Sequence, residues 1–457
     1  MSALNLPLKE VSMKDRSAPV LFPAYLKLSS PPLEVGDEFN QATIWPKMDR
    51  WAEVSKWAQD NPAMGEALVT SQFAVVLGLP YGTNGLDPAW VKAGLSISFG
   101  DGDVDGRMAC NYFKPIRTIG AYATAEMYRR GEAGEFESAF TIGIAYARLL
   151  RQVCEQGMLE EKLFGLEALA EALSIHRDFM WTYLDRLPVP VMQRVALKEY
   201  SFLKPSDNEK LRRLQMPEGD RIIVAAILKR ALAVADGGSV DAEQFATVIG
   251  AQESLAGPLQ AFHTQEMWRR VALVHGSLEA SNEKLESVYD DWWRRWKLRP
   301  SSQIQQMATE LSRTNPIKYA VVVSMVRDLA RAFEWRNAVI TELNGTIMAA
   351  GLCGYFLDFK KSWPKDPERA HAVYFQKRFD FDPFSKKTAH MKYRALSTKQ
   401  AIDTPLGRVW ATGCMIWAVG ANHEDDGGAT HSVDGTVGDL VLWPPVRALA
   451  REEGLVK

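Results

Sequence analysis

The chain has 457 residues and a formal net charge of -2, because 54 lysines and arginines nearly balance 56 aspartates and glutamates. Hydrophobic residues make up 47% and charged residues 24%, ordinary globular values that exclude a disordered, a collagen-like or a disulfide-stapled protein. The near-neutral balance lacks the electrostatic footprint of a general nucleic-acid binder, so no nucleic-acid partner is expected. The four cysteines are far apart in sequence, which favours reduced, buried thiols over a disulfide framework or a zinc site.

The N-terminus and the apolar segments bear on location. Residues 1–10 lack the basic region and apolar core of a secretory signal peptide, so a cytoplasmic protein is the default expectation. The apolar run over residues 347–359 is shorter than the roughly 18 to 20 residues that a membrane-spanning helix needs. We therefore expect no membrane span in this chain.

Residues 1–110 predict an irregular N-terminal region with short helices. Apolar residues at helical spacing predict one such helix over residues 47–60, ended by Pro62. Residues 101–106 (DGDVDG) resemble the start of a calcium loop, in which alternate carboxylates reach one cation and a glycine forms the turn. Tyr112 stands where such a loop has its closing carboxylate, so a solvated acidic turn is the alternative interpretation.

Residues 111–332 have the apolar periodicity of a body of long amphipathic helices. The segment 130–139 is similar to the turn between paired helices of tetratricopeptide-like repeats. That pattern does not recur at the repeat length of about 34 residues, so we expect helical hairpins without a regular array. Asp241, followed by Gln244, has the spacing of a capping box at a helix start. Helices are expected over residues 116–127, 136–153, 163–173, 191–203, 221–235, 266–275, 282–297 and 301–313.

One predicted helix carries a cluster of aromatic residues. Tyr289, Trp292, Trp293 and Trp296 are spaced to share one stripe, with Arg294 and Arg295 beside it. Aromatic and arginine side chains together are typical of protein interfaces and of surfaces that stack nucleic-acid bases. The same pattern fits a core in which the tryptophans fill the space between large helices. Core packing and a protein interface are therefore the two main interpretations, and base stacking is the third.

Residues 333–457 predict a long helix followed by a small head. A helix-periodic apolar segment covers residues 317–359, with a break expected at Asn344-Gly345. The best strands are residues 409–419 and 440–442. The expected fold is therefore mainly α, with helical hairpins, tetratricopeptide-like in places, before a small α/β C-terminal domain.

Three segments in this last part carry a family resemblance. They are residues 355–358 (YFLD) with Trp363-Pro364, residues 381–384 (FDPF) with Tyr393-Arg394, and the glycine- and aspartate-rich residues 416–441. In this order they resemble the helix exit, the sheet entry and the final loop of type II secretion pseudopilins, as in the major pseudopilin. The preceding chain is similar to uncharacterised bacterial proteins that place helical hairpins before such a head. The resemblance implies a pseudopilin-like head and association with the cell envelope, but more than three hundred residues precede the long helix, so pilus-style polymerisation is not implied.

The final loop of pseudopilins binds calcium, and the resemblance implies the same here. Asp425, Asp426 and Asp439 match its acidic positions, Asn422 matches an oxygen-bearing position, and Asp434 is an additional ligand candidate. Calcium takes six to eight oxygen ligands, which carboxylates, an amide and glycine-rich backbone carbonyls can provide. The alternative is a hydrogen-bonded Asp/Gly turn that closes the head without a metal.

No motif of high specificity for catalysis is present in the sequence: no nucleophile elbow, phosphate-binding loop or HExxH helix occurs. The sequence therefore favours a non-enzymatic structural or scaffold subunit, stabilised by calcium, that assembles with itself or with other proteins. The alternative is a hydrolase whose site is assembled from residues distant in sequence, with His176 or His263 beside acidic partners.

Overall fold

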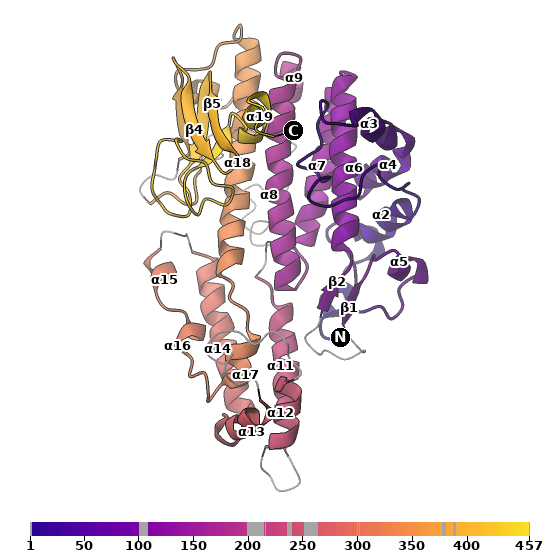
Figure 1. Cartoon of the computed structure of the whole chain (residues 1–457), viewed down its shortest axis with the longest axis vertical. Helices are drawn as coiled ribbons and strands as arrows, with labels where there is room; N and C mark the ends of the chain where they lie inside the picture. Colours follow the sequence, from indigo (N-terminus) through magenta and orange to yellow (C-terminus); the bar gives the residue numbers. More distant parts are fainter. Residues whose placement is uncertain are drawn as a thin grey trace.

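A computed structural model describes residues 2–99, 108–198, 214, 216–234, 240–250, 264–298, 300, 302–376, 381–386 and 390–456. The protein is mainly helical, with a small antiparallel sheet region near the C-terminus, which confirms the expected fold class at this level. The long helices run along the longest axis and form an upper and a lower bundle (Figure 1). The expected calcium loop at residues 101–106 lies outside the described residues.

The N-terminal region consists of short elements that cover one side of the upper bundle (Figure 1). The expected helix over residues 47–60 forms from Trp51, with Val54 and Trp57 buried. Pro62 follows the end of this helix and is also the first residue of the next one. At that position the missing N–H of proline has no cost. The elements are α1 (Leu6–Lys9), η1 (Met13–Asp15), α2 (Ala18–Tyr25), α3 (Trp51–Asp60), α4 (Pro62–Ser71), α5 (Pro88–Lys92), β1 (Ile97–Phe99) and β2 (Met108–Cys110).

The upper bundle is built from antiparallel hairpins. Its helices are α6 (Phe113–Glu132), α7 (Phe136–Val153), α8 (Leu159–Thr182) and α9 (Val189–Leu197). The bounds of α7 agree with the expected residues 136–153, and the preceding turn contains Gly134 with a positive φ of 80°. Helix α6 packs against α7 and α7 against α8, while α3 and α4 cover the outer side of this layer.

The lower bundle contains α11 (Gly219–Ala231), α12 (Ala242–Gly250), α13 (Gln265–Val274), α14 (Leu278–Trp296), α15 (Gln303–Gln306), α16 (Glu310–Arg313) and α17 (Ala320–Met325). Asp241 caps α12 as expected, since its Oδ1 accepts hydrogen bonds of 3.0 Å from the backbone N–H groups of Glu243 and Gln244. The expected capping box is not completed, because the Gln244 side chain donates to the backbone carbonyl of Arg230 instead. The expectation of one helix over residues 301–313 is wrong, because residues 307–309 separate α15 from α16.

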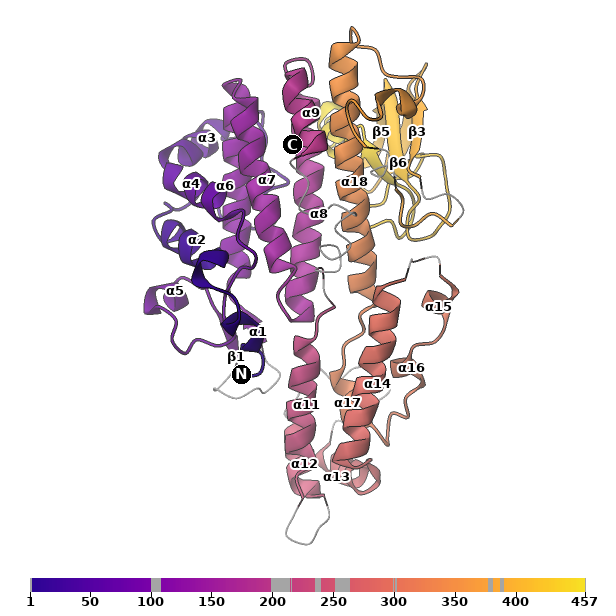
Figure 2. The same ribbon diagram turned by 180° about the vertical axis from the view of Figure 1, so that it is seen from behind.

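Helix α18 (Ala330–Asp358) lies between α8 and α9 on one side and the head on the other, as Figure 2 shows from behind. The break expected at Asn344-Gly345 is wrong. Both residues are buried inside α18, and the break between α17 and α18 falls at residues 326–329. A Cβ atom on Gly345 would lie 2.4 Å from Cδ1 of Leu442, so glycine here permits the close approach of the head.

The head contains η4 (Pro367–Ala370), β3 (Lys392–Ala395), β4 (Gln400–Thr404), β5 (Gly407–Ala411), β6 (Cys414–Ala418), β7 (Leu440–Trp443) and α19 (Val446–Glu452). The strand expected over residues 409–419 divides into β5 and β6, with Gly413 between them at a φ of 79°. One sheet has the antiparallel order β3-β6-β7 and the other is the β4-β5 hairpin. Along β6, Ile416 faces the main core on α18, whereas Met415 packs into a second core beneath β5 and α19.

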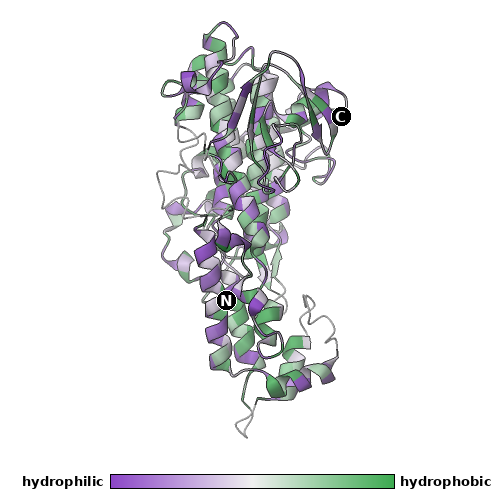
Figure 3. Cartoon of the chain, turned by 90° about the vertical axis from the view of Figure 1, so that its left-hand side faces the viewer, coloured by the Kyte–Doolittle hydropathy of each residue, from purple (hydrophilic) through white to green (hydrophobic). Residues whose placement is uncertain are grey.

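Hydrophobic and hydrophilic residues are interspersed along the helices in Figure 3, as expected for amphipathic helices that bury one face. Within the described residues, no helix is both long enough and apolar enough to cross a membrane.

Candidate functional site

Two of the five expected calcium ligands lie together in the head. Asp439, directly before β7, is fully buried, and its Oδ2 accepts a 2.7 Å hydrogen bond from the backbone N–H of Gly428. Its Oδ1 has no hydrogen-bond donor in the described structure. Burial, followed by the side chain of Asp426, raises the pKa of Asp439 to about 8. Such a shift is typical of two carboxyl groups that share one proton.

The other three expected ligands are occupied within the loop. Asp425 accepts a 3.0 Å hydrogen bond from Nε1 of Trp417 and pairs with Nζ of Lys392 at 3.2 Å. The Asn422 and Asp434 side chains each accept a backbone N–H two residues later, at 3.1 Å. These contacts build the turns of the loop, and the described residues contain no group of three or more histidine, cysteine, aspartate or glutamate side chains arranged to hold a metal ion.

The aromatic stripe lies mostly in the chain's own core. Tyr289, Trp292 and Trp296 are each at most 3% exposed, and the last two contact the ring of Phe333. Trp293 is half-buried and donates a 2.7 Å hydrogen bond to Oε1 of Glu218. This burial favours the core-packing interpretation over a protein interface, because three of the four side chains are not accessible to a partner.

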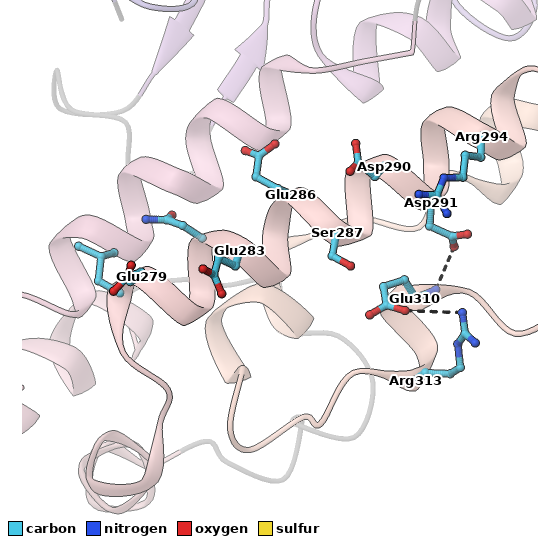
Figure 4. A pocket seen from close by; sticks show the side chains of 11 residues that line it. Glu279, Glu283, Glu286, Ser287, Asp290, Asp291, Arg294, Glu310 and Arg313 are labelled. Atoms are coloured by element: carbon cyan, nitrogen blue, oxygen red, sulfur yellow. Dashed lines mark hydrogen bonds and ion pairs between the residues drawn. The ribbon is translucent and has the colours of Figure 1, made fainter.

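The exposed side of α14 carries an unusual set of charges. A groove of about 910 Å³ lies there, and Figure 4 shows α14 and α16 on either side of its side chains. Six carboxylate residues but only two arginines line this acidic groove. Its lining residues are Leu278, Glu279, Asn282, Glu283, Glu286, Ser287, Asp290, Asp291, Arg294, Glu310 and Arg313.

The carboxylates of the acidic groove fall into two groups. Glu286, Asp291 and Glu310 have cationic partners, the closest being Arg221, Arg295 and Lys284 at 2.6, 3.0 and 2.8 Å. In contrast, Glu279, Glu283 and Asp290 are exposed and have no ion-pair partner among the described residues. The three lie on one stripe of the helix, because their spacing is four and seven residues.

A second concavity lies where the head meets the upper bundle. This junction pocket has a volume of about 530 Å³, and the segments that line it are far apart in sequence. They are residues 35–41, parts of α6, α7, α8 and α18, and residues 405–406 and 431–447 of the head.

Buried charges form the base of the junction pocket. Arg177 of α8 is 2% exposed; its Nη2 lies 2.5 Å from Oε2 of Glu342 and its Nη1 donates a 2.6 Å hydrogen bond to Oγ1 of Thr346. Burial raises the pKa of Glu342, although Arg177 lowers it in part. The head supplies Arg447, whose guanidinium is 3.9 Å from Asp178 of α8.

Two histidines differ in their surroundings. His431 lines the junction pocket and its Nδ1 accepts a 3.1 Å hydrogen bond from the backbone N–H of Val441. Loss of solvent contact lowers the pKa of His431 to about 4, so the ring is neutral and its Nε2 carries the proton. His176, a residue considered for a hydrolase, is buried beside a small cavity that no acidic side chain lines. His263 lies outside the described residues.

Sequence reasoning did not identify either concavity. The acidic groove had a readable signal, because residues 279, 283, 286 and 290 repeat at helical spacing. The junction pocket had no local signal, since each segment contributes only a few of its residues. No protein-family model, curated protein or solved structure matches this chain.

Proposed function

We propose that the chain is a non-enzymatic structural subunit whose acidic groove receives a lysine- and arginine-rich segment of a protein partner. The observation that carries this proposal is the stripe of exposed carboxylates at Glu279, Glu283 and Asp290, which have no ion-pair partner within the described part of the chain. Glu279 lies in the first turn of α14, where a negative charge favours the helix. Glu283 follows it at four residues, and like charges at this spacing are destabilising by a few tenths of a kcal/mol, so Glu283 does not serve the stability of the isolated chain. A cationic partner would remove this repulsion and would be steered to the groove over a long range.

The binding test uses a fluorescently labelled, lysine-rich helical peptide, with a glutamine-rich peptide of the same length as the control. Anisotropy should report binding of the lysine-rich peptide only, weakening as the salt concentration rises. A triple variant, Glu279→Gln with Glu283→Gln and Asp290→Asn, should lower the affinity at least about tenfold.

The matched control has the same change in net charge at exposed sites away from the groove: Glu38→Gln, Glu66→Gln and Glu453→Gln. It should change the affinity by less than about twofold. If both triple variants weaken binding equally, the peptide responds to net charge and the groove is not the docking site. Sedimentation at low and high salt, without peptide, tests whether a second copy of the chain is the partner.

We also propose that the head is pseudopilin-like and that Asp426 and Asp439 hold a calcium ion in its final loop. Support for the calcium site comes from the adjacent carboxyl groups of Asp426 and Asp439 and from the burial of Asp439. The glycine-rich loop has backbone carbonyls that could complete the oxygen shell.

Support for the head assignment comes from α18, which leads through Trp363-Pro364 to an antiparallel sheet packed on that helix. The α6–α7 hairpin, with its turn at Gly134, supports the tetratricopeptide-like comparison in the same way.

A further inference from the structure

We infer that the junction pocket binds a small organic anion, with one carboxylate or phosphate group on an apolar body, and that this ligand fastens the head to the helical bundle. The inference is independent of the acidic groove, which lies on α14 in the lower bundle.

The base of the pocket offers hydrogen-bond donors that the protein does not satisfy. Nη1 of Arg447 is buried and has no hydrogen-bond partner in the described structure. Its guanidinium lies 3.7 Å from Glu171 and 3.9 Å from Asp178, which is longer than a hydrogen bond. The Nε of the buried Arg177 also has no hydrogen-bond partner among the described residues. Unsatisfied buried donors are costly, so the site is suited to an acceptor from outside the chain.

The deep carboxylates of the lining have neighbours within the chain, although Oε2 of Glu342 accepts no hydrogen bond in the described structure, so the choice of an anion rests on the unsatisfied arginine donors. Glu342 pairs with Arg177, and Oε2 of Glu171 accepts a 2.5 Å hydrogen bond from Gln41. The two remaining carboxylates of the lining, Asp37 and Glu167, are exposed at its rim. A ligand anion at the base can accept hydrogen bonds from Nη1 of Arg447 and Nε of Arg177, neither of which has a hydrogen-bond partner in the described structure.

Neutral groups define the rest of the ligand. The protonated Nε2 of the neutral His431 can donate a hydrogen bond to the ligand. The buried Oε1 of Gln41 accepts no hydrogen bond from the described residues and suits a ligand hydroxyl. The walls include the apolar side chains of Phe164, Trp335 and Val441. A volume of about 530 Å³ falls within the range of small-molecule sites, and apolar walls with a few convergent polar groups are typical of such sites.

The position of the pocket gives the ligand a structural effect. Arg177 and Trp335 belong to the helical bundle, whereas His431 and Arg447 belong to the head. A ligand that contacts both parts binds only their docked arrangement, and it therefore stabilises that arrangement by mass action.

The test measures the melting temperature of the full chain with benzoate, phenyl phosphate, inorganic phosphate, neutral benzamide and cationic benzylamine. Benzoate or phenyl phosphate should raise the melting temperature, and benzamide and benzylamine should not. The organic anion that gives the larger rise in melting temperature shows whether the pocket prefers a carboxylate or a phosphate. If inorganic phosphate raises the melting temperature as much as phenyl phosphate does, the ligand needs no apolar body. If neither organic anion exceeds benzamide, the inference is wrong.

Variants locate the binding. Arg447→Gln should lower the affinity for the responding anion at least about tenfold by calorimetry, at a temperature where circular dichroism shows the variant folded. The control is Arg408→Gln, which removes an exposed arginine of the head that pairs with Asp403 at 2.7 Å. This control should bind as the unmodified chain does. Equal binding by the Arg447→Gln variant and the unmodified chain would overturn the assignment to the junction pocket.

Discussion

Nη2 of Arg177 on α8 lies 2.5 Å from Oε2 of Glu342 on α18, and both side chains are almost fully buried. Burial raises the pKa of Glu342 despite the arginine, so the attraction between the two charges does not fully offset the loss of hydration. The pair therefore fixes how α8 and α18 align beneath the head more than it adds to net stability.

Replacing either partner of this pair alone should lower the stability of the fold strongly, because it leaves the other charge buried without its partner. Arg177→Met leaves the Glu342 charge in the core, and Glu342→Leu leaves the arginine, so each should lower the free energy of unfolding by about 3–5 kcal/mol. The free energy of unfolding of the double variant should fall by clearly less than the sum of the decreases in the two single variants. Urea unfolding of the four proteins measures this coupling, and strictly additive losses would show that the two side chains act independently.

Glu161 should make stability depend on pH. Its carboxyl accepts 2.7 Å hydrogen bonds from the hydroxyls of Tyr81 and Tyr112, and burial raises its pKa from 4.5 to about 7. A raised pKa in the folded state means that this stabilisation is fully present below about pH 4.5 and is lost as the pH rises through about 7.

Glu161→Gln removes this loss, because the amide stays neutral and keeps hydrogen-bonding groups beside both tyrosines. The variant should match the unmodified chain near pH 5 and exceed its stability at pH 8.5, by on the order of 3 kcal/mol. Thermal unfolding across pH measures the difference. Glu160→Gln, the partly exposed neighbour, is the control and should show no such trend. A constant difference at every pH would mean that Glu161 is ionised throughout.

Local sequence patterns predicted the elements whose ends depend on neighbouring residues. Helix α7 begins after Gly134, and Asp241 caps α12, because each signal acts within a few residues. Asn344-Gly345 has the composition of a turn, yet α18 continues through it. The reason is a contact distant in sequence, since Leu442 of β7 packs where a side chain on Gly345 would be.

The sites depended on tertiary structure to a greater extent. The sequence showed that Tyr289, Trp292 and Trp296 share a face, but only the position of α18 shows that Phe333 covers it. Arg177 and Arg447 meet at the junction pocket across 270 positions of the chain, and no spacing rule connects them.

Gly345→Ala should destabilise the contact between the head and α18. The added Cβ would lie 2.4 Å from Cδ1 and 3.0 Å from Cβ of Leu442, so β7 must move and not only a side-chain tip. Overpacking of this kind costs about 1–3 kcal/mol, which exceeds the helix-propensity gain of about 1 kcal/mol. The control is Gly250→Ala, where no atom of the described residues lies within 4 Å of the added Cβ. A rise in melting temperature for both variants would contradict the close approach.

Calcium should stabilise the head, and the effect should increase with pH. Asp439 has a pKa raised to about 8, so without calcium its stabilising protonated form is lost as the pH rises through that value. Calcium binding displaces the shared proton, so the affinity for calcium should increase with pH. At about one hundred times the dissociation constant, calcium adds about 2.7 kcal/mol to the free energy of unfolding. Thermal melting at pH 7 and pH 9, with calcium or chelator, measures both effects.

Two amide variants separate calcium binding from proton sharing. Asp439→Asn removes the buried charge, so at pH 9 in chelator it should melt above the unmodified chain, and calcium should not raise its melting temperature further. Asp434→Asn alters a partly exposed side chain that accepts hydrogen bonds from Thr436, and it should keep the calcium response. If calcium and chelator give equal melting temperatures at pH 9 for the unmodified chain, Asp426 and Asp439 only share a proton. In that case the loop closes the head without a metal, and Asp439→Asn should still raise the melting temperature at pH 9.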